Sequence, residues 1–88
     1  MIEFRKELIE KILQSPNEKE IESNINDSIN RMIENGTNMH IIKRFEDKLE
    51  SDLKFEISEP HTEKEFSNIK GALRVMKEIT LKNNSVIQ

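Results

Sequence analysis

Two rows of apolar residues with a spacing of four stand on either side of Asn35–Gly36. The first row is Ile21, Ile25, Ile29 and Ile33, and the second row is Ile41, Phe45, Leu49, Leu53 and Ile57. Residues four apart lie on one side of an α-helix. Glycine readily takes the left-handed conformation that closes many helices. The two rows therefore predict a helical hairpin whose turn is at Asn35–Gly36.

Length and composition indicate a small domain without covalent cross-links. Eighty-eight residues correspond to one domain, expected to span residues 1–88. The sequence has no cysteine, so helix packing must supply the stability without disulfides. The start lacks the features of a secretion signal, and no apolar run is long enough to span a membrane. We therefore expect a cytoplasmic protein that does not interact with membranes.

The first two helices are predicted at residues 2–14 and 16–35. Ser15, Pro16 and Glu18 match a capping box, in which the serine hydroxyl accepts a hydrogen bond from the glutamate amide and proline occupies the first helical position. The second helix would then start at Pro16 and be closed by the glycine that follows it.

The third helix is predicted at residues 39–55. Thr37 or Asn38 can cap its start, and Pro60 prevents it from continuing far beyond Ser58. Residues 53–57 alternate between apolar and polar, which also fits a strand, but the chain offers almost nothing for a strand to pair with. A helix is therefore favoured for this segment.

The fourth helix is predicted at residues 63–82. Thr62 and Glu65 form a second capping box at its start. Asn83–Asn84 is expected to end the helix and to leave residues 84–88 as a frayed tail.

These segments predict an all-α fold, a small antiparallel four-helix bundle in up-and-down order. A strict spacing of four drifts by about 40° per step because a helix repeats every 3.6 residues, so Ile41 and Ile57 would lie about 160° apart. Such rows need neighbours on two sides, which the first and fourth helices can supply. The same spacing favours a crossing angle near about −50°, and this angle is compatible with a splayed bundle.

No pattern in the sequence indicates catalysis, a cofactor or a metal centre. No serine stands in a glycine-flanked nucleophile elbow, and two glycines cannot form a phosphate-binding loop. His40 and His61 are expected to be ordinary turn residues, because neither has an acidic residue three positions earlier, as carboxylate-bridged metal sites in bundles require. A loosely held ion at residues 59–63 is the weaker alternative. We therefore expect a protein that is not an enzyme and binds no cofactor.

Five residues are candidates for contacting a partner. Phe55 lies about 110° from the apolar row of its helix, and Leu81 falls among Lys70, Arg74 and Lys77, three cations within about 60° of each other. The cations either bind an acidic partner or nucleic acid, or pair with the acidic sides of the second and third helices. Pairing is favoured, because three cations without an interleaved aromatic residue make a small nucleic-acid footprint.

Gly71 is unusual because it stands inside the fourth helix, where glycine costs about 1 kcal/mol relative to alanine. It would let another helix backbone approach closely. A contact within the bundle and a contact with a second copy explain it equally well.

The function that best fits these features is binding to another protein or to a second copy of the chain, through apolar residues left on the surface. In size, acidity and four-helix architecture the chain is similar to small bacteriocin-immunity proteins, which neutralise a toxin by masking its surface. This likeness, and an adaptor-like role, concern architecture alone. The alternative is a nucleic-acid-associated regulator that uses the cations of the fourth helix. A net charge of −3 with mixed signs argues against it.

Overall fold

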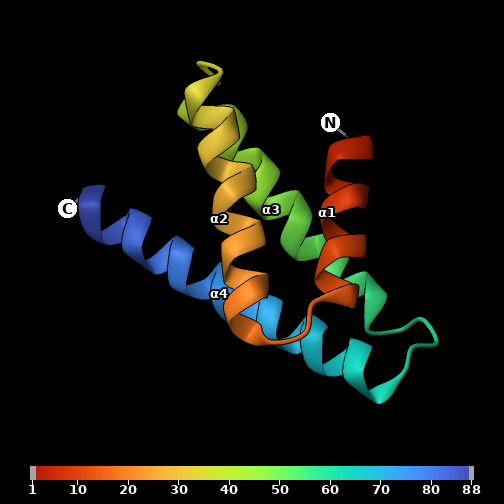
Figure 1. Cartoon of the computed structure of the whole chain (residues 1–88). Helices are drawn as coiled ribbons and strands as arrows, with labels where there is room; N and C mark the ends of the chain where they lie inside the picture. The colour runs from red at the N-terminus through yellow and green to blue at the C-terminus, as the bar shows by residue number, and fades with distance from the viewer. Residues whose placement is uncertain (1, 88) are drawn as a thin grey trace.

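The computed structural model describes the backbone of residues 2–87 and the side chains of residues 3–81. Its helices are α1 (Ile2–Gln14), α2 (Glu18–Glu34), α3 (Met39–Glu56) and α4 (Glu63–Ile87), as Figure 1 shows. The described backbone contains no strand. The protein is therefore an all-α helical bundle, as the spacing of apolar residues predicted.

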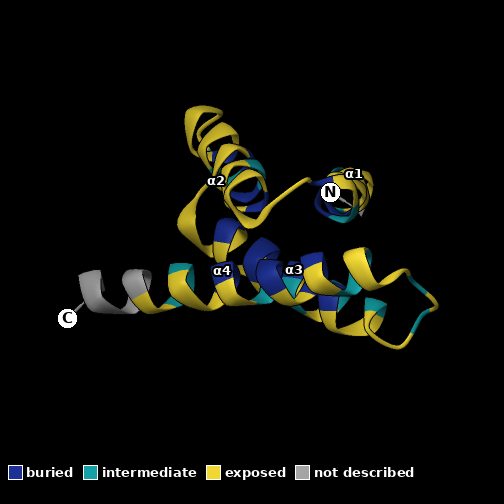
Figure 2. Ribbon diagram, turned by 60° about the horizontal axis from the view of Figure 1, so that its bottom comes forward, coloured by how far each residue is buried: buried dark blue, intermediate teal, exposed yellow. Residues whose placement is uncertain are grey.

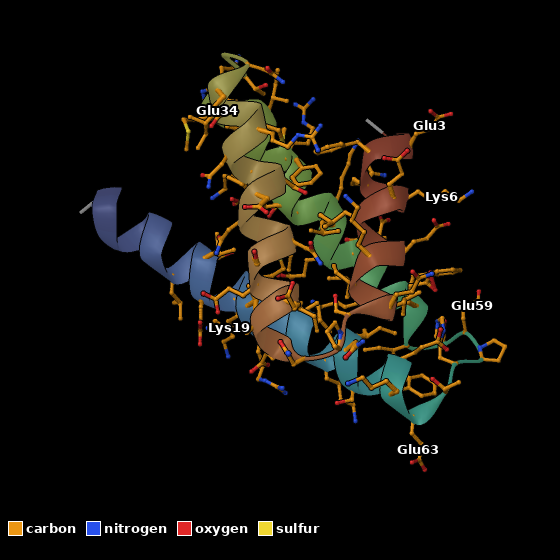
Figure 3. All side chains as sticks on the ribbon, viewed as in Figure 1. Glu3, Lys6, Lys19, Glu34, Glu59 and Glu63 are labelled. Carbon is orange, nitrogen blue, oxygen red and sulfur yellow. The ribbon has the colours of Figure 1, made fainter. Side chains whose placement is uncertain are left out.

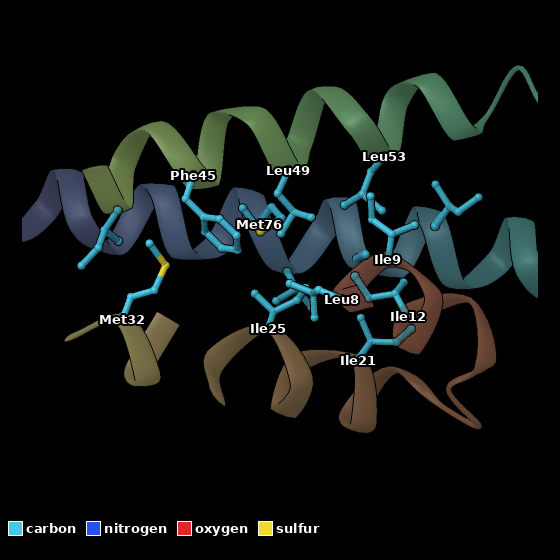
Figure 4. Close-up of a cluster of buried hydrophobic side chains, with 14 residues drawn as sticks. Leu8, Ile9, Ile12, Ile21, Ile25, Met32, Phe45, Leu49, Leu53 and Met76 are labelled. Atoms are coloured by element: carbon cyan, nitrogen blue, oxygen red, sulfur yellow. The ribbon is translucent and has the colours of Figure 1, made fainter. Parts of the chain in front are cut away.

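The helices form two layers. α1 and α2 pack together in one layer, and α3 and α4 run side by side in the other (Figures 2 and 4). α4 contacts all three other helices, whereas α2 and α3 contact each other least of any pair. Residues 35–38 join α2 to α3 directly, and from this turn the two helices diverge (Figure 1). The bundle is consequently splayed, and the predicted hairpin is open along its length.

One cluster of buried apolar side chains fills the space between the layers (Figure 4). Its members are Leu8, Ile9, Ile12, Ile21, Ile25, Met32, Ile42, Phe45, Leu49, Leu53, Ile69, Ala72, Val75 and Met76. Every helix contributes to this cluster, so α1 and α4 do supply the neighbours that the two apolar rows needed. Charged side chains point away from the bundle, as Figure 3 shows for Glu3, Lys6, Lys19, Glu34, Glu59 and Glu63.

The buried side of α2 follows the 3.6-residue repeat of the helix instead of the strict spacing of four. Its buried residues are Ile21, Ile25, Ser28 and Met32. These positions lie within about 60° of each other on a helical wheel. Ile33, the last residue of the predicted row, is 53% exposed. The row therefore leaves the core before it reaches the turn.

The second row behaves in the same way at both of its ends. Ile41 and Ile57 are 41% and 42% exposed, whereas Leu49 at its centre is 0% exposed. The drift of a four-residue spacing thus carries the outer residues onto the surface, where no other helix covers them.

The predicted capping box at the start of α2 is wrong. The helix begins at Glu18, and its cap is Asn17, whose side-chain oxygen accepts a hydrogen bond from the Glu20 amide at 2.9 Å. Ser15 is buried, and its hydroxyl donates to the Lys11 carbonyl at 2.7 Å. Because this serine is held by the end of α1, the next residue suited to capping takes the role, and asparagine caps as well as serine does.

The other helix starts confirm the sequence analysis. Asn38 caps α3, and Thr62 and Glu65 form the reciprocal pair of a capping box at α4, with distances of 2.9 and 3.1 Å. Gly36 has a φ of 80° and closes α2 in the left-handed conformation.

Three helix ends differ from the predicted bounds. α2 ends at Glu34, one residue before the predicted end at Asn35. α3 ends at Glu56, so residues 53–56 are helical and the alternative of a strand is excluded there. α4 reaches Ile87 instead of ending near Lys82. Asparagine costs a helix only about 0.7 kcal/mol relative to alanine, so Asn83–Asn84 does not stop a helix that lacks a glycine or proline at that place. Residue 88 lies outside the described part of the chain.

Candidate functional site

An open groove of about 230 Å³ lies over α4, where α2 and α3 diverge. It is lined by Glu22, Asn26, Ile29 and Ile33 of α2, by Met39, Ile42 and Glu46 of α3, and by Val75, Glu78 and Ile79 of α4. Among the described side chains that line it there is no lysine, arginine or histidine. The groove therefore combines an apolar surface with carboxylates from three helices.

The groove has an apolar end and an acidic end. Residues equally far from the turn lie at the same level of two antiparallel helices, so Ile33 and Met39 face each other next to the turn. Glu22 and Glu46 lie farther from the turn, and α4 adds Glu78 to the lining. Glu22 and Ile33 are eleven residues apart in one helix, which corresponds to about 16 Å. The groove thus extends over about three helical turns.

Two large apolar side chains at the turn end remain in solvent. Ile33 is 53% exposed and Met39 is 62% exposed. Burial of such a side chain is worth about 1.5–3 kcal/mol. Single exposed apolar residues are common, but here they adjoin half-buried Ile29 and Ile79 in one groove. This continuity distinguishes the groove from scattered surface residues.

The carboxylates of the groove differ in their surroundings. Glu22 and Glu78 are exposed, whereas Glu46 is only 6% exposed and already has an interaction partner within the protein. The first two are therefore the carboxylates that an incoming cation can reach without displacing a contact of the fold.

The predicted contact residues Phe55 and Leu81 are exposed but lie apart. Phe55 is 64% exposed and lies beside the stems of Arg5 and Lys6, near the turn that joins α3 to α4. Leu81 is 57% exposed and stands eighteen residues beyond the start of α4, about 27 Å along that helix. These two residues do not form a common surface, and neither lines the groove.

Of the three cations of α4, one is paired within the bundle and two remain available for a partner. Arg74 donates to one carboxylate oxygen of Glu18 in α2, at 2.7 Å from its Nη2 and 3.0 Å from its Nε. Lys70 and Lys77 are exposed and have no ion pair with any described side chain. Intramolecular pairing thus accounts for one of the three cations.

Gly71 is explained by a contact within the bundle. It is buried, and a Cβ atom at this position would lie 3.2 Å from Oε1 of Glu18. The glycine leaves room for the Glu18 side chain, whose carboxylate pairs with Arg74. A contact with a second copy is not needed to explain it.

His61 has a structural role that the sequence analysis missed, whereas His40 is exposed. The His61 ring lies between two carboxylates, with Nε2 at 3.3 Å from Glu56 and Nδ1 at 3.5 Å from Glu65. The hydrogen bond from the Thr62 amide is the main cause that lowers the pKa of Glu65 below its usual value. No group of three metal-ligating side chains occurs among the described residues. This cluster therefore orders the turn before α4.

Asn68 is the second residue whose role the sequence analysis missed. Its amide group is buried and donates to the carbonyls of Ile12, Leu13 and Ser15 at 3.0, 3.0 and 2.9 Å. It thereby satisfies the last carbonyls of α1, which have no partner inside their own helix. A polar residue directly before Ile69 on the apolar side of α4 was the signal that could have identified it.

Two further findings bear on the class of protein. No helix in the described part of the chain is both long and apolar enough to cross a bilayer. Comparison with models of protein families, with curated proteins and with solved structures found no match. Any functional conclusion therefore has to come from the groove and its surroundings.

Proposed function

We propose that this protein is a small non-enzymatic binding protein that accommodates a helix of a partner protein in the groove between α2 and α3. The observation that carries the proposal is the divergence of two helices joined by a single turn, which leaves apolar side chains of both uncovered. A further helix laid into this gap would complete the layer above α4. Recognition of an amphipathic helix by an apolar groove is a common mode of protein binding.

The dimensions of the groove support this proposal. Its length of about 16 Å matches about three turns of a helix, which present apolar anchors at spacings of three, four and seven residues. Interface energies are concentrated in a few buried anchors. Ile33 and Met39 are suited to contact such anchors because each still has most of its surface to bury.

The test uses two isoleucines that are both exposed but differ in position. Ile33 lines the groove, whereas Ile41 lies outside it. Partners retained from lysate by the wild-type protein should be lost with Ile33→Asn and retained with Ile41→Asn. Circular dichroism should show the same helix content for both variants. If Ile33→Asn retains the same partners as the wild type, the groove is not the binding surface.

The other exposed residues proposed from the sequence are weaker candidates for binding than the groove. Phe55 and Leu81 remain candidates for secondary contacts. In the nucleic-acid alternative, Arg74 is exposed but already paired with Glu18. This leaves Lys70 and Lys77 as the cations of the strip without an ion pair to a described side chain, too few for a strong electrostatic footprint. The absence of cysteine is compatible with action in the reducing cytoplasm, which we include in the proposal.

A further inference from the structure

The charges around the groove also specify the kind of helix that it takes. Its exposed carboxylates, Glu22 and Glu78, come from α2 and α4, and Glu22 lies at the end of the groove away from the α2–α3 turn. Within the described lining no cation offsets them. We infer that the occupant is a cationic amphipathic helix of another protein, with its apolar anchors next to Ile33 and Met39 and its lysines or arginines next to the two glutamates. This inference rests on the proposed function.

A second copy of the chain fits the groove poorly. In a symmetric dimer both subunits present the same surface, so the exposed glutamates of two grooves would be brought into one interface without a cation from either lining to offset them. Like charges brought together at an interface cost several kcal/mol. A head-to-tail contact would need an apolar surface flanked by cations. The basic strip of α4 offers one exposed apolar side chain, Leu81, which is too little to cover an apolar groove about three turns long.

A partner with cations satisfies both parts of the groove. Its apolar face would cover the exposed isoleucine and methionine, and its cations would approach carboxylates that already lie in solvent. Exposed ion pairs contribute about 0.2–1 kcal/mol each, so each glutamate should change the affinity by about 1.4- to 5-fold. Their larger effect should be on selectivity and on the rate of association.

The experiment uses three designed peptides that share the same apolar face. Each forms about four helical turns with leucines on one side. The flanking positions carry lysine in the first peptide, glutamine in the second and glutamate in the third. Fluorescence anisotropy at low and high salt gives the affinity of the full-length protein for each peptide. The lysine peptide should bind about 2- to 25-fold more tightly than the glutamine peptide at low salt, and the difference should shrink as salt is added.

Variants that each remove one negative charge show which glutamates cause the preference for the lysine peptide. Glu22→Gln and Glu78→Gln should each weaken the lysine peptide by about two- to fivefold and leave the glutamine peptide unchanged. Glu10→Gln removes the same charge from an exposed position of α1 outside the groove and is the matched control. It should leave all three affinities unchanged.

The outcomes separate the inference from the proposed function. If the glutamine and lysine peptides bind equally well and Ile33→Asn weakens both, the groove binds helices but the inferred charge of the partner is wrong. If Glu10→Gln weakens the lysine peptide as much as Glu22→Gln does, the attraction is not specific to the groove and the inference is also wrong. A dimer that sedimentation detects and Ile33→Asn abolishes would show that the occupant is a second copy. If no peptide binds in a manner that depends on Ile33, the proposed function itself is contradicted.

Discussion

Asn68 forms a buried polar connection between the two layers. It extends from α4 to three carbonyl oxygens at the end of α1, at 2.9–3.0 Å. Removal of this buried donor takes away the hydrogen bonds to the Leu13 and Ser15 carbonyls, whereas the Ile12 carbonyl still accepts from the Ser15 amide at 3.2 Å. A buried acceptor left without its donor costs about 1–3 kcal/mol. We expect Asn68→Ala to lower the free energy of unfolding by at least this amount, as measured by urea denaturation.

The matched control for this variant is Asn30→Ala, at an exposed asparagine of α2. It should change the free energy of unfolding by no more than about 0.5 kcal/mol, because surface substitutions rarely do more. Equal effects of the two substitutions would show that the contacts of Asn68 add nothing to stability.

Helix caps and turn conformations could be predicted from the sequence where they depend on residues nearby in the chain. The Thr62–Glu65 capping box and the left-handed Gly36 follow from local geometry, and both were predicted correctly. Ser15 was not, because its hydroxyl and carbonyl are engaged by residues of α1 and α4 that the local pattern does not include. Tertiary contacts decided which of two suitable residues caps α2.

At the scale of the helix, α4 organises the molecule because it packs against the other three helices more extensively than any other helix does. Gly71 reduces the intrinsic stability of this helix but admits the Glu18 side chain. A new Cβ would meet the far end of that side chain at 3.2 Å, and the carboxylate is half in solvent and free to shift slightly. The gain in helix propensity, about 1 kcal/mol, should therefore exceed the loss.

We thus predict that Gly71→Ala raises the free energy of unfolding by about 0.5–1 kcal/mol. The gain should be larger in a background that carries Glu18→Ala, where no carboxylate has to move. A double-mutant cycle measured by urea denaturation gives both values. A loss of stability in both backgrounds would mean that the notch at Gly71 is needed for the approach of the α2 backbone.

The helices themselves were predictable, but the partners of their apolar sides were not. The spacing of four suggested Ile29 and Ile33 as continuations of the buried row, whereas the structure buries Ser28 and Met32. The same drift of the row that the sequence analysis described was the signal for exposed ends. The sequence does not indicate which helix covers each end of an apolar row, because that depends on how the two layers pack against each other.

At the scale of the whole molecule, the two-layer arrangement explains both the stability and the open groove. The shared core joins α1 and α2 to α3 and α4, and it does not require α2 and α3 to close on each other. Ile33 and Met39 are therefore not needed for the fold. A partner can therefore bury these two side chains without disturbing the fold.

The candidates selected from the sequence, Phe55 and Leu81, were chosen because they depart from the apolar side of their own helices. That criterion identifies single exposed residues. It cannot identify the groove, in which Ile29 and Ile33 come from a predicted apolar row whereas Met39 and Ile42 come from neither row. These residues are uncovered together because α2 and α3 diverge. The site therefore became visible only when the arrangement of layers was known.

The most direct test of this account is a titration of the isotope-labelled protein with the lysine-flanked peptide, followed by nuclear magnetic resonance of the backbone amides. We predict that the largest shift changes occur around Ile29, Ile33, Met39 and Glu78. Amides around Phe55 and Lys70 should change little. Changes concentrated at either of those two places, with the groove unaffected, would contradict the claim that the opening between α2 and α3 is the binding surface.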